Sequence, residues 1–112
     1  MDSKDKAVCI ANLAADKKAE DIILLDIKKL SSIADYIIIC TGISDRQVQA
    51  IAEHIESALK KKKVVSIGTE GIREGRWALI DYGDVIVHIF CESLRLLYNL
   101  EGLWAEASRL TI

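Results

Sequence analysis

Two aspartates beside an expected turn are the side chains in this sequence best placed to hold a cation. Asp81 and Asp84 are three positions apart, with Gly83 between them. Aspartate is common in turns because its carboxylate bonds to the local backbone, so the spacing favours a structural role over a weak cation site. Magnesium-dependent nucleotidyl transfer needs closely spaced carboxylates, and the chain has no D-x-D pair. We therefore expect no metal site.

A glycine-rich phosphate-binding loop is also absent from the sequence. Gly68, Gly71 and Gly75 fit neither G-x-x-x-x-G-K-[ST] nor G-x-G-x-x-G. The segment Gly42-Ile43-Ser44 lies between an expected strand and an expected helix, whose free N–H groups are able to hold an anion. A nucleotide-binding enzyme that combines this turn with the aspartate pair is the alternative function that the residues leave open.

The histidines and cysteines do not form a recognisable reactive site. His54 and His88 have no cysteine or second histidine at the spacing of zinc ligands. Cys9, Cys40 and Cys91 form no C-x-x-C motif, and each lies among apolar neighbours, as small buried side chains do. The odd cysteine number and the lack of a signal peptide predict a reducing, cytoplasmic location. We expect no catalytic residue and no cofactor.

The composition is that of one globular domain over residues 1–112. The chain is 51% hydrophobic and 29% charged, which suits a single core and is too apolar for a disordered segment. A formal net charge of −2 argues against direct, sequence-specific nucleic-acid binding. The uninterrupted apolar runs are too short to cross a membrane.

Hydrophobic periodicity predicts an α/β fold with a single mixed β-sheet of about five strands and helices packed on it. The second helix is the clearest element, because Ser44 and Gln47 have capping-box spacing and an apolar stripe follows them. The expected elements are a helix to about residue 18, strands at 22–25 and 36–40, a helix over about 44–60, strands at 64–67, 77–82 and 85–90, and a helix after Cys91 that is interrupted at Gly102.

The strands at 77–82 and 85–90 are expected to form a hairpin. A two-residue turn at either Tyr82-Gly83 or Gly83-Asp84 gives the same two faces, because the two registers differ by two residues. One face is apolar and belongs to the core. The other carries Trp77, Leu79, Asp81, Ile86, His88 and Phe90. This mixed face fits a surface that another molecule covers, although Trp77 and Phe90 packed beneath a terminal helix is an equal alternative, and a three-residue loop would change the pairing.

The last third of the chain is aromatic and acidic. Five of the six aromatic residues lie in the last 36 positions, and residues 77–108 hold five acidic residues against Arg95 alone. Aromatic side chains are enriched at the energetic centres of interfaces, and charge steers the encounter of partners. The distribution predicts a surface that recognises a basic protein.

Four sequence segments resemble those of the ribosomal silencing factors of the RsfS/Iojap family. They are Ser31-Ser32-Ile33-Ala34-Asp35-Tyr36, Cys40-Thr41-Gly42, Gly83-Asp84-Val85-Ile86-Val87-His88 and Tyr98-Asn99-Leu100-Glu101-Gly102-Leu103-Trp104. The resemblance covers about residues 5–104 and leaves 105–112 as a tail. It implies a fold similar to that of nucleotidyltransferases but without their catalytic carboxylates, and hence a protein that is not an enzyme.

The resemblance further implies a translation repressor that binds the large ribosomal subunit through the basic ribosomal protein numbered fourteenth in that subunit, and so blocks joining of the small subunit. It implies a homodimer when the protein is free, and large-subunit assembly is a further alternative role. The partner-binding residues that it highlights are Trp77, Asp81, Asp84, His88, Arg95, Tyr98, Glu101 and Trp104. Trp77 and Tyr98 are expected to be apolar anchors, and Asp81, Asp84 and Glu101 to face Lys or Arg. Structural roles are the alternatives: Asp84 in the turn, Trp104 in the core, and Arg95 paired with Glu101 or Asp84.

Overall fold

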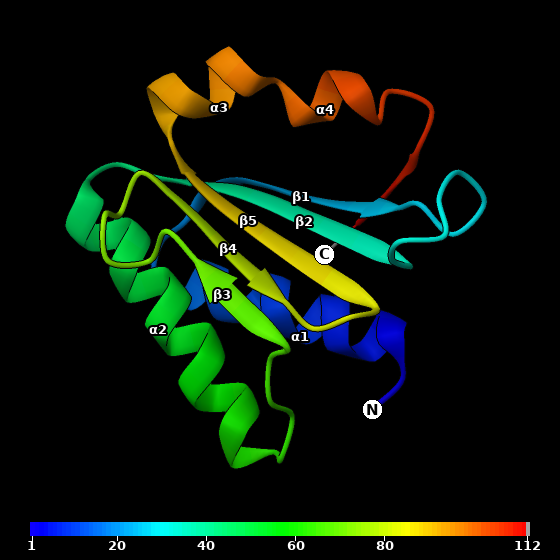
Figure 1. Ribbon diagram of the computed structural model, residues 1–112, viewed down its shortest axis with the longest axis horizontal. Coiled ribbons are helices and arrows are strands. Elements are labelled where there is room, and N and C mark those ends of the chain that lie inside the picture. The colour runs from blue at the N-terminus through cyan, green and yellow to red at the C-terminus, as the bar shows by residue number, and fades with distance from the viewer. Residues whose placement is uncertain (112) are drawn as a thin grey trace.

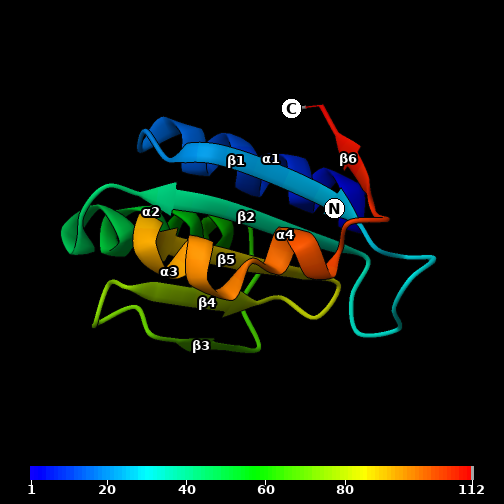
Figure 2. The same cartoon turned by 90° about the horizontal axis from the view of Figure 1, so that it is seen from above.

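The computed structural model describes residues 1–111, which form one six-stranded mixed sheet covered by helices on both faces (Figure 1). The elements are α1 (Ser3–Asp16), β1 (Glu20–Asp26), β2 (Tyr36–Gly42), α2 (Asp45–Lys61), β3 (Gly68–Glu70), β4 (Trp77–Asp81), β5 (Val85–Cys91), α3 (Glu92–Tyr98), α4 (Leu100–Leu103) and β6 (Ser108–Leu110). Helices α1 and α2 cover one face, and α3 and α4 lie on the other (Figures 1 and 2). No helix among these residues is long and apolar enough to cross a bilayer.

The strands lie in the order β3-β4-β5-β2-β1-β6. Only β2 and β5 run parallel to each other, and every other neighbouring pair is antiparallel. The parallel pair lies at the centre, which explains the sequence of β2. All seven of its residues are buried, because helices cover both of its faces. The predicted α/β class with a single mixed sheet is confirmed, with six strands instead of about five.

The sheet divides the apolar residues into two cores. The larger core lies under α1 and α2 and includes Ile10, Ile38, Ile55 and Val87, all fully buried. The smaller core lies under α3 and α4 and is built around Ile37, Ile39 and Phe90, with Trp77 and Trp104 packed against it. The short helices cover this second face only in part. The candidate partner-binding site lies on this face.

Helix α2 starts as its sequence predicts. The Ser44 hydroxyl accepts a hydrogen bond from the Gln47 backbone N–H at 3.1 Å, and the Gln47 side chain accepts one from the N–H of Ile43. Gly42 has no room for a side chain, because an added Cβ would lie 2.8 Å from Val48 Cγ2. The Gly42-Ile43-Ser44 turn therefore serves the cap and the close packing of α2 on β2.

Removing this cap is expected to destabilise the protein. The Ser44→Ala variant leaves the Gln47 N–H without its partner, and should lose about 1 kcal/mol of unfolding free energy. Urea denaturation monitored by circular dichroism measures the loss. Arg46→Ala is the matched control, because it shortens an exposed side chain in the same turn without touching the cap. Equal stability of Ser44→Ala and the parent protein would contradict a capping role.

The hairpin forms with the two-residue turn Gly83-Asp84, one of the two predicted registers. Trp77 pairs with Phe90 and Asp81 with Ile86. Gly83 has a φ of 87°, which is the left-handed value that the first position of a type II′ turn requires. The predicted division of the hairpin into two faces is therefore confirmed.

The strand predicted at 64–67 is wrong, because the strand β3 lies at Gly68–Glu70. The first residue of the apolar run 64–67 belongs to the C-terminal cap of α2. Lys63 is left-handed with a φ of 64°, and the Val64 N–H donates to the Leu59 carbonyl, as in a Schellman cap. Val64 thus packs against the core as part of a helix cap, and the chain joins the sheet only after Ile67.

Two further expectations near the C-terminus need correction. The last helix breaks at Asn99, not at Gly102. Asn99 adopts a φ of 45° that ends α3, and its side-chain oxygen accepts from the Gly102 N–H at 3.2 Å to cap α4. The tail after Trp104 contains β6, which the sequence did not indicate, because three residues that alternate weakly carry almost no local signal.

Candidate partner-binding site

Four aromatic rings meet where α3 crosses the sheet, and we call them the aromatic cluster: Trp77, His88, Phe90 and Tyr98. The Trp77 ring centroid lies 4.9 Å from that of Phe90, its cross-strand neighbour, and 4.6 Å from that of Tyr98 on α3. His88 stacks on Phe90 at 6.0 Å. These spacings are those of favourable aromatic pairs. The hairpin register places three of the rings, and the docking of α3 adds the fourth.

Burial within the aromatic cluster is graded. Phe90 is fully buried and His88 is 8% exposed, whereas Trp77 is half-buried and Tyr98 is 51% exposed. Beside Trp77 the sheet surface is hollowed into a pocket of about 280 Å³, with Leu79 on its wall. The inner rings thus act as a rigid support, and the outer two present aromatic surface to solvent. This arrangement suits a partner-binding anchor.

His88 orients the exposed tryptophan. The Trp77 indole Nε1–H donates a hydrogen bond of 3.1 Å to His88 Nδ1, so the imidazole is neutral, with its proton on Nε2. Burial lowers the pKa of His88 to about 4, because the charged ring would lose its hydration. His88 therefore holds the indole in place and carries no charge at neutral pH.

Acid should destabilise the protein through His88. The unfolded chain binds a proton at His88 near pH 6.5, whereas the folded chain binds it only near pH 4, so stability falls as the pH drops through this window. We expect a loss of about 2 kcal/mol between pH 7 and pH 5 from this group. Urea denaturation at several pH values measures it. His88→Gln should flatten the slope and His54→Gln should keep it; identical slopes in all three proteins would contradict the assignment.

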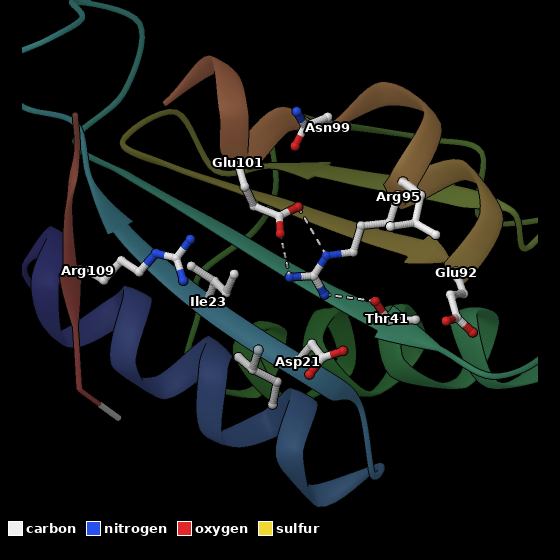
Figure 3. Close-up of a pocket in the computed structure, with 10 residues that line it drawn as sticks. Asp21, Ile23, Thr41, Glu92, Arg95, Asn99, Glu101 and Arg109 are labelled. Carbon is white, nitrogen blue, oxygen red and sulfur yellow. Dashed lines mark hydrogen bonds and ion pairs between the residues drawn. The ribbon is translucent and has the colours of Figure 1, made fainter. Parts of the chain in front are cut away.

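A buried arginine joins α3 to α4 and to the central strand (Figure 3). The Arg95 Nε and Nη2 atoms donate to the two carboxylate oxygens of Glu101 at 3.1 and 3.2 Å, and Nη1 donates to the Thr41 hydroxyl at 2.8 Å. The Arg95 side chain is 9% exposed and that of Glu101 25%. The Arg95–Glu101 pair lies on the wall of a groove of about 610 Å³ between α3 and the β1–β6 edge. The pairing of Arg95 with Glu101 was one of the alternatives that the sequence left open. No sequence pattern near Arg95 indicated its hydrogen bond to Thr41.

The structure separates the remaining predicted site residues. Asp84 forms a 2.8 Å ion pair with Lys6 of α1, and Asp81 accepts from the Gly83 N–H at 2.7 Å, so both carboxylates serve the hairpin and its packing. Trp104 packs into the smaller core at the α4 end, outside the aromatic cluster. Only Trp77, His88 and Tyr98, with the neighbouring Arg95–Glu101 pair, come together. The other three predicted residues lie apart from them or make internal contacts.

Exposed leucines extend the apolar surface beyond the aromatic rings. Leu97 on α3 is 72% exposed, and Leu103 on α4 is equally so. Large side chains that remain in water on short, adjacent helices indicate a surface that is covered in a complex. The apolar run after Cys91 indicated a helix, but only the structure shows that Arg95 is the buried residue of α3 and that Leu97 and Leu103 are exposed.

The two halves of the alternative nucleotide site lie far apart. The Asp84 carbonyl accepts from the Tyr36 N–H at the start of β2, whereas Gly42 ends the same strand. Six residue steps along a strand span roughly 20 Å. The aspartates and the Gly42-Ile43-Ser44 turn therefore cannot hold one small ligand between them.

Comparison with known proteins identifies the family of this chain. The family model described as ribosomal silencing factor during starvation, RsfS, matches residues 1–112. The ribosomal silencing factor RsfS of Bacillus subtilis is 45% identical over 107 residues, which cover 96% of this chain and 91% of that protein. The chloroplastic protein Iojap of Arabidopsis thaliana is 34% identical, over 95% of this chain and 44% of its own length.

A solved structure shows the same fold. The crystal structure of a protein from Chromobacterium violaceum superposes with a TM-score of 0.91 at 38% sequence identity, covering 94% of this chain and 88% of that one. The match therefore includes both the sequence and the arrangement of the sheet and helices. The chain therefore belongs to the RsfS family of ribosomal silencing factors.

Proposed function

We propose that this protein represses translation by binding the large ribosomal subunit through a basic ribosomal protein, the fourteenth of that subunit, and blocking the small subunit sterically. The observation that carries this proposal is the pair of solvent-facing rings, Trp77 and Tyr98, on a sheet face that the short helices leave partly open. Their support from Phe90 and His88 makes the surface rigid before binding. A preorganised aromatic surface loses little conformational entropy when it docks.

The charges near this surface favour a basic partner. Glu70 lies on the same pocket wall as Trp77, and Asp81 lies on the same face of β4. Glu92 and Glu106 are exposed on the segments around α3 and α4. Acidic groups around an apolar centre guide a positively charged partner and raise the rate of encounter. Glu101 and Asp84 contribute less to this field, because Arg95 and Lys6 neutralise them.

The proposed mechanism needs no reaction at the site. A domain with extents of 34 × 34 × 23 Å, seated by one face, covers ribosomal surface that the small subunit must approach. In its free form we propose that a second copy covers the exposed Leu97 and Leu103 and the aromatic rings, giving a homodimer. Light scattering coupled to gel filtration measures that mass, and a monomer at micromolar concentration would refute the dimer.

Sedimentation through a sucrose gradient tests the proposed repression. The protein is mixed with purified large or small subunits, and the missing subunit is then added. We expect co-migration with the large subunit alone and fewer joined ribosomes. A folded protein that binds neither subunit at micromolar concentration would overturn the proposal. Binding to precursor particles but not to mature large subunits would assign it to assembly instead.

A further inference from the structure

Strand β3 (Gly68–Glu70) forms one edge of the sheet, on the side of β4 away from β5. Within residues 1–111 no other element lies beyond it, and all three of its residues are exposed (Figure 2). An edge strand offers unpaired backbone N–H and C=O groups to a further strand, and proteins often block this pairing with proline or lysine. Strand β3 contains neither residue. Its outer edge is therefore open to pairing.

The hydrogen bonds of the β4–β5 hairpin fix the direction of the backbone groups in β4. The Tyr82 N–H donates to the Val85 carbonyl, and the Cys91 N–H donates to the Arg76 carbonyl. Successive residues of an antiparallel strand present their backbone groups to alternate neighbours. The even-numbered residues of the segment 76–82 therefore bond to β5, and its odd-numbered residues bond to β3.

Thr69 is consequently the residue of β3 whose backbone groups point outward. Gly68 lies opposite Asp81, and Glu70 also lies opposite an odd-numbered residue of β4, so both bond to β4. The Ile67 N–H, which donates to the Asp81 carbonyl at 2.7 Å, agrees with this direction. Thr69 lies between Gly68 and Glu70, so its N–H and C=O face the open edge. A further strand can bond to them without disturbing β4.

A pocket connects this edge to the aromatic cluster. It has a volume of about 280 Å³ and is lined by Glu70 and Gly71 at the edge and by Trp77 and Leu79 of β4. The Glu70 carboxylate has no ion-pair partner within 4.0 Å in the part of the chain that the structure describes. A molecule that covers Trp77 therefore lies beside an uncompensated carboxylate and an open strand edge.

The size and charge of the edge indicate its occupant. Two copies of this chain paired through such short edges cannot bury the roughly 800 Å² per partner that a stable interface needs. They would also bring no cation to Glu70, since β3 carries no basic residue. A strand of a partner that is already seated on the aromatic cluster needs no such area, because the neighbouring rings supply most of the binding energy. The Glu70 carboxylate then favours a basic residue in that strand.

We propose that the ribosomal protein bound in the proposed function, on which this inference rests, adds an extended basic segment to the sheet as a strand beside β3. The Thr69 N–H donates to a carbonyl of the segment, and the Thr69 carbonyl accepts from one of its N–H groups. Main-chain bonds of this kind hold peptides on the open edges of sheets, and alternate side chains supply the specificity.

Strand alternation places the side chains of the added segment. The residue opposite Thr69 points to the α2 side, and its two neighbours point to the side of the aromatic cluster, one beside Gly68 and one beside Glu70. An added Cβ at Gly68 would meet no atom within 4 Å, so space is open for the first of these neighbours. An arginine or lysine beside Glu70 lays its aliphatic stem along the pocket and its cation on the carboxylate.

Amide exchange in the free protein tests whether the edge is open. Nitrogen–proton correlation NMR after transfer to deuterated water measures the exchange residue by residue. We expect the Thr69 amide to exchange at least about tenfold faster than the amides of Gly68 and Glu70, which bond to β4. A Thr69 amide that exchanges as slowly as these two would show that its N–H already has a partner, and would refute the strand addition.

Co-sedimentation with purified large subunits tests the added strand itself. Thr69→Pro removes the outward N–H and should weaken binding about three- to tenfold, whereas Thr69→Val keeps the N–H and should bind as the parent protein does. Proline is tolerated on an edge strand where the missing N–H faced solvent, so the melting temperature of Thr69→Pro should stay within about 3 °C of the parent. Glu70→Gln should weaken binding about two- to fivefold, and Glu74→Gln, at an exposed carboxylate on the β3–β4 loop, should leave it unchanged.

The outcomes separate the strand addition from the proposed repression. Equal affinity of Thr69→Pro and Thr69→Val, with the parent protein bound, would overturn the strand addition and leave the repression intact. A parent protein that binds no large subunit removes both. Hydrogen exchange followed by mass spectrometry needs no substitution: binding should slow the exchange of residues 67–71. Unchanged exchange there would contradict the added strand even if Thr69→Pro does not fold.

Discussion

Replacing Tyr98 with alanine is expected to weaken binding to the large ribosomal subunit about tenfold, without unfolding the domain. Tyr98 is 51% exposed and its ring packs at a tilt against Trp77, with 4.6 Å between the ring centroids, so the substitution removes the outer ring of the aromatic cluster and leaves its buried rings in place. Truncation of an aromatic anchor at an interface typically costs 1–2 kcal/mol or more, which corresponds to about five- to thirtyfold in affinity. Co-sedimentation with large subunits over a range of protein concentrations measures the change.

The controls separate binding from folding. Val65→Ala shortens a side chain that is 69% exposed beside the other face of the sheet, and should bind as the parent protein does. Tyr98→Phe keeps the ring and should retain most of the affinity. Trp77→Ala should act in the same direction as Tyr98→Ala, although it also leaves His88 Nδ1 without its donor and therefore costs stability. Full affinity of a folded Tyr98→Ala protein would remove this surface from the proposed interface.

Substitution of Arg95 with glutamine is expected to cause the largest loss of stability, about 2–4 kcal/mol. The change leaves the Glu101 carboxylate and the Thr41 hydroxyl without their guanidinium partner in a largely buried setting. Removing one member of a buried ion pair is strongly destabilising, because the charge that remains is poorly solvated. This expected loss is smaller than the usual cost of breaking a fully buried ion pair, because the Glu101 side chain is 25% exposed and water partly solvates its charge.

Chemical denaturation with urea measures this effect, and two further variants identify its origin. Arg76→Gln removes an exposed arginine next to β4 and should change the unfolding free energy by less than about 0.5 kcal/mol. The double variant Arg95→Met, Glu101→Leu removes both charges and should be more stable than Arg95→Gln, because no unpaired ion remains. An Arg95→Gln protein as stable as the parent would show that the network contributes nothing to the fold.

Local patterns in the sequence predicted the elements whose signals are complete within a few residues. The Ser44 cap and the apolar stripe of α2, the uninterrupted run of β2 and the turn at Gly83 each depend on contacts within one element or one hairpin. The same dependence on local patterns caused the wrong strand prediction at residues 64–67. Val64 and its neighbours have the composition of a strand, but the left-handed Lys63 makes Val64 a helix cap.

The sequence by itself determined the family, the mixed α/β class and the two faces of the hairpin, because strand alternation and turn chemistry are local properties. Only the tertiary structure decided which predicted site residues meet. Asp84 pairs with Lys6 across 78 positions, and Arg95 reaches Thr41 across 54. Such contacts depend on the docking of whole elements and have no sequence period. For the same reason the fold, and not the composition, brought Trp77 and Tyr98 into one aromatic cluster and placed Trp104 outside it, against the smaller core.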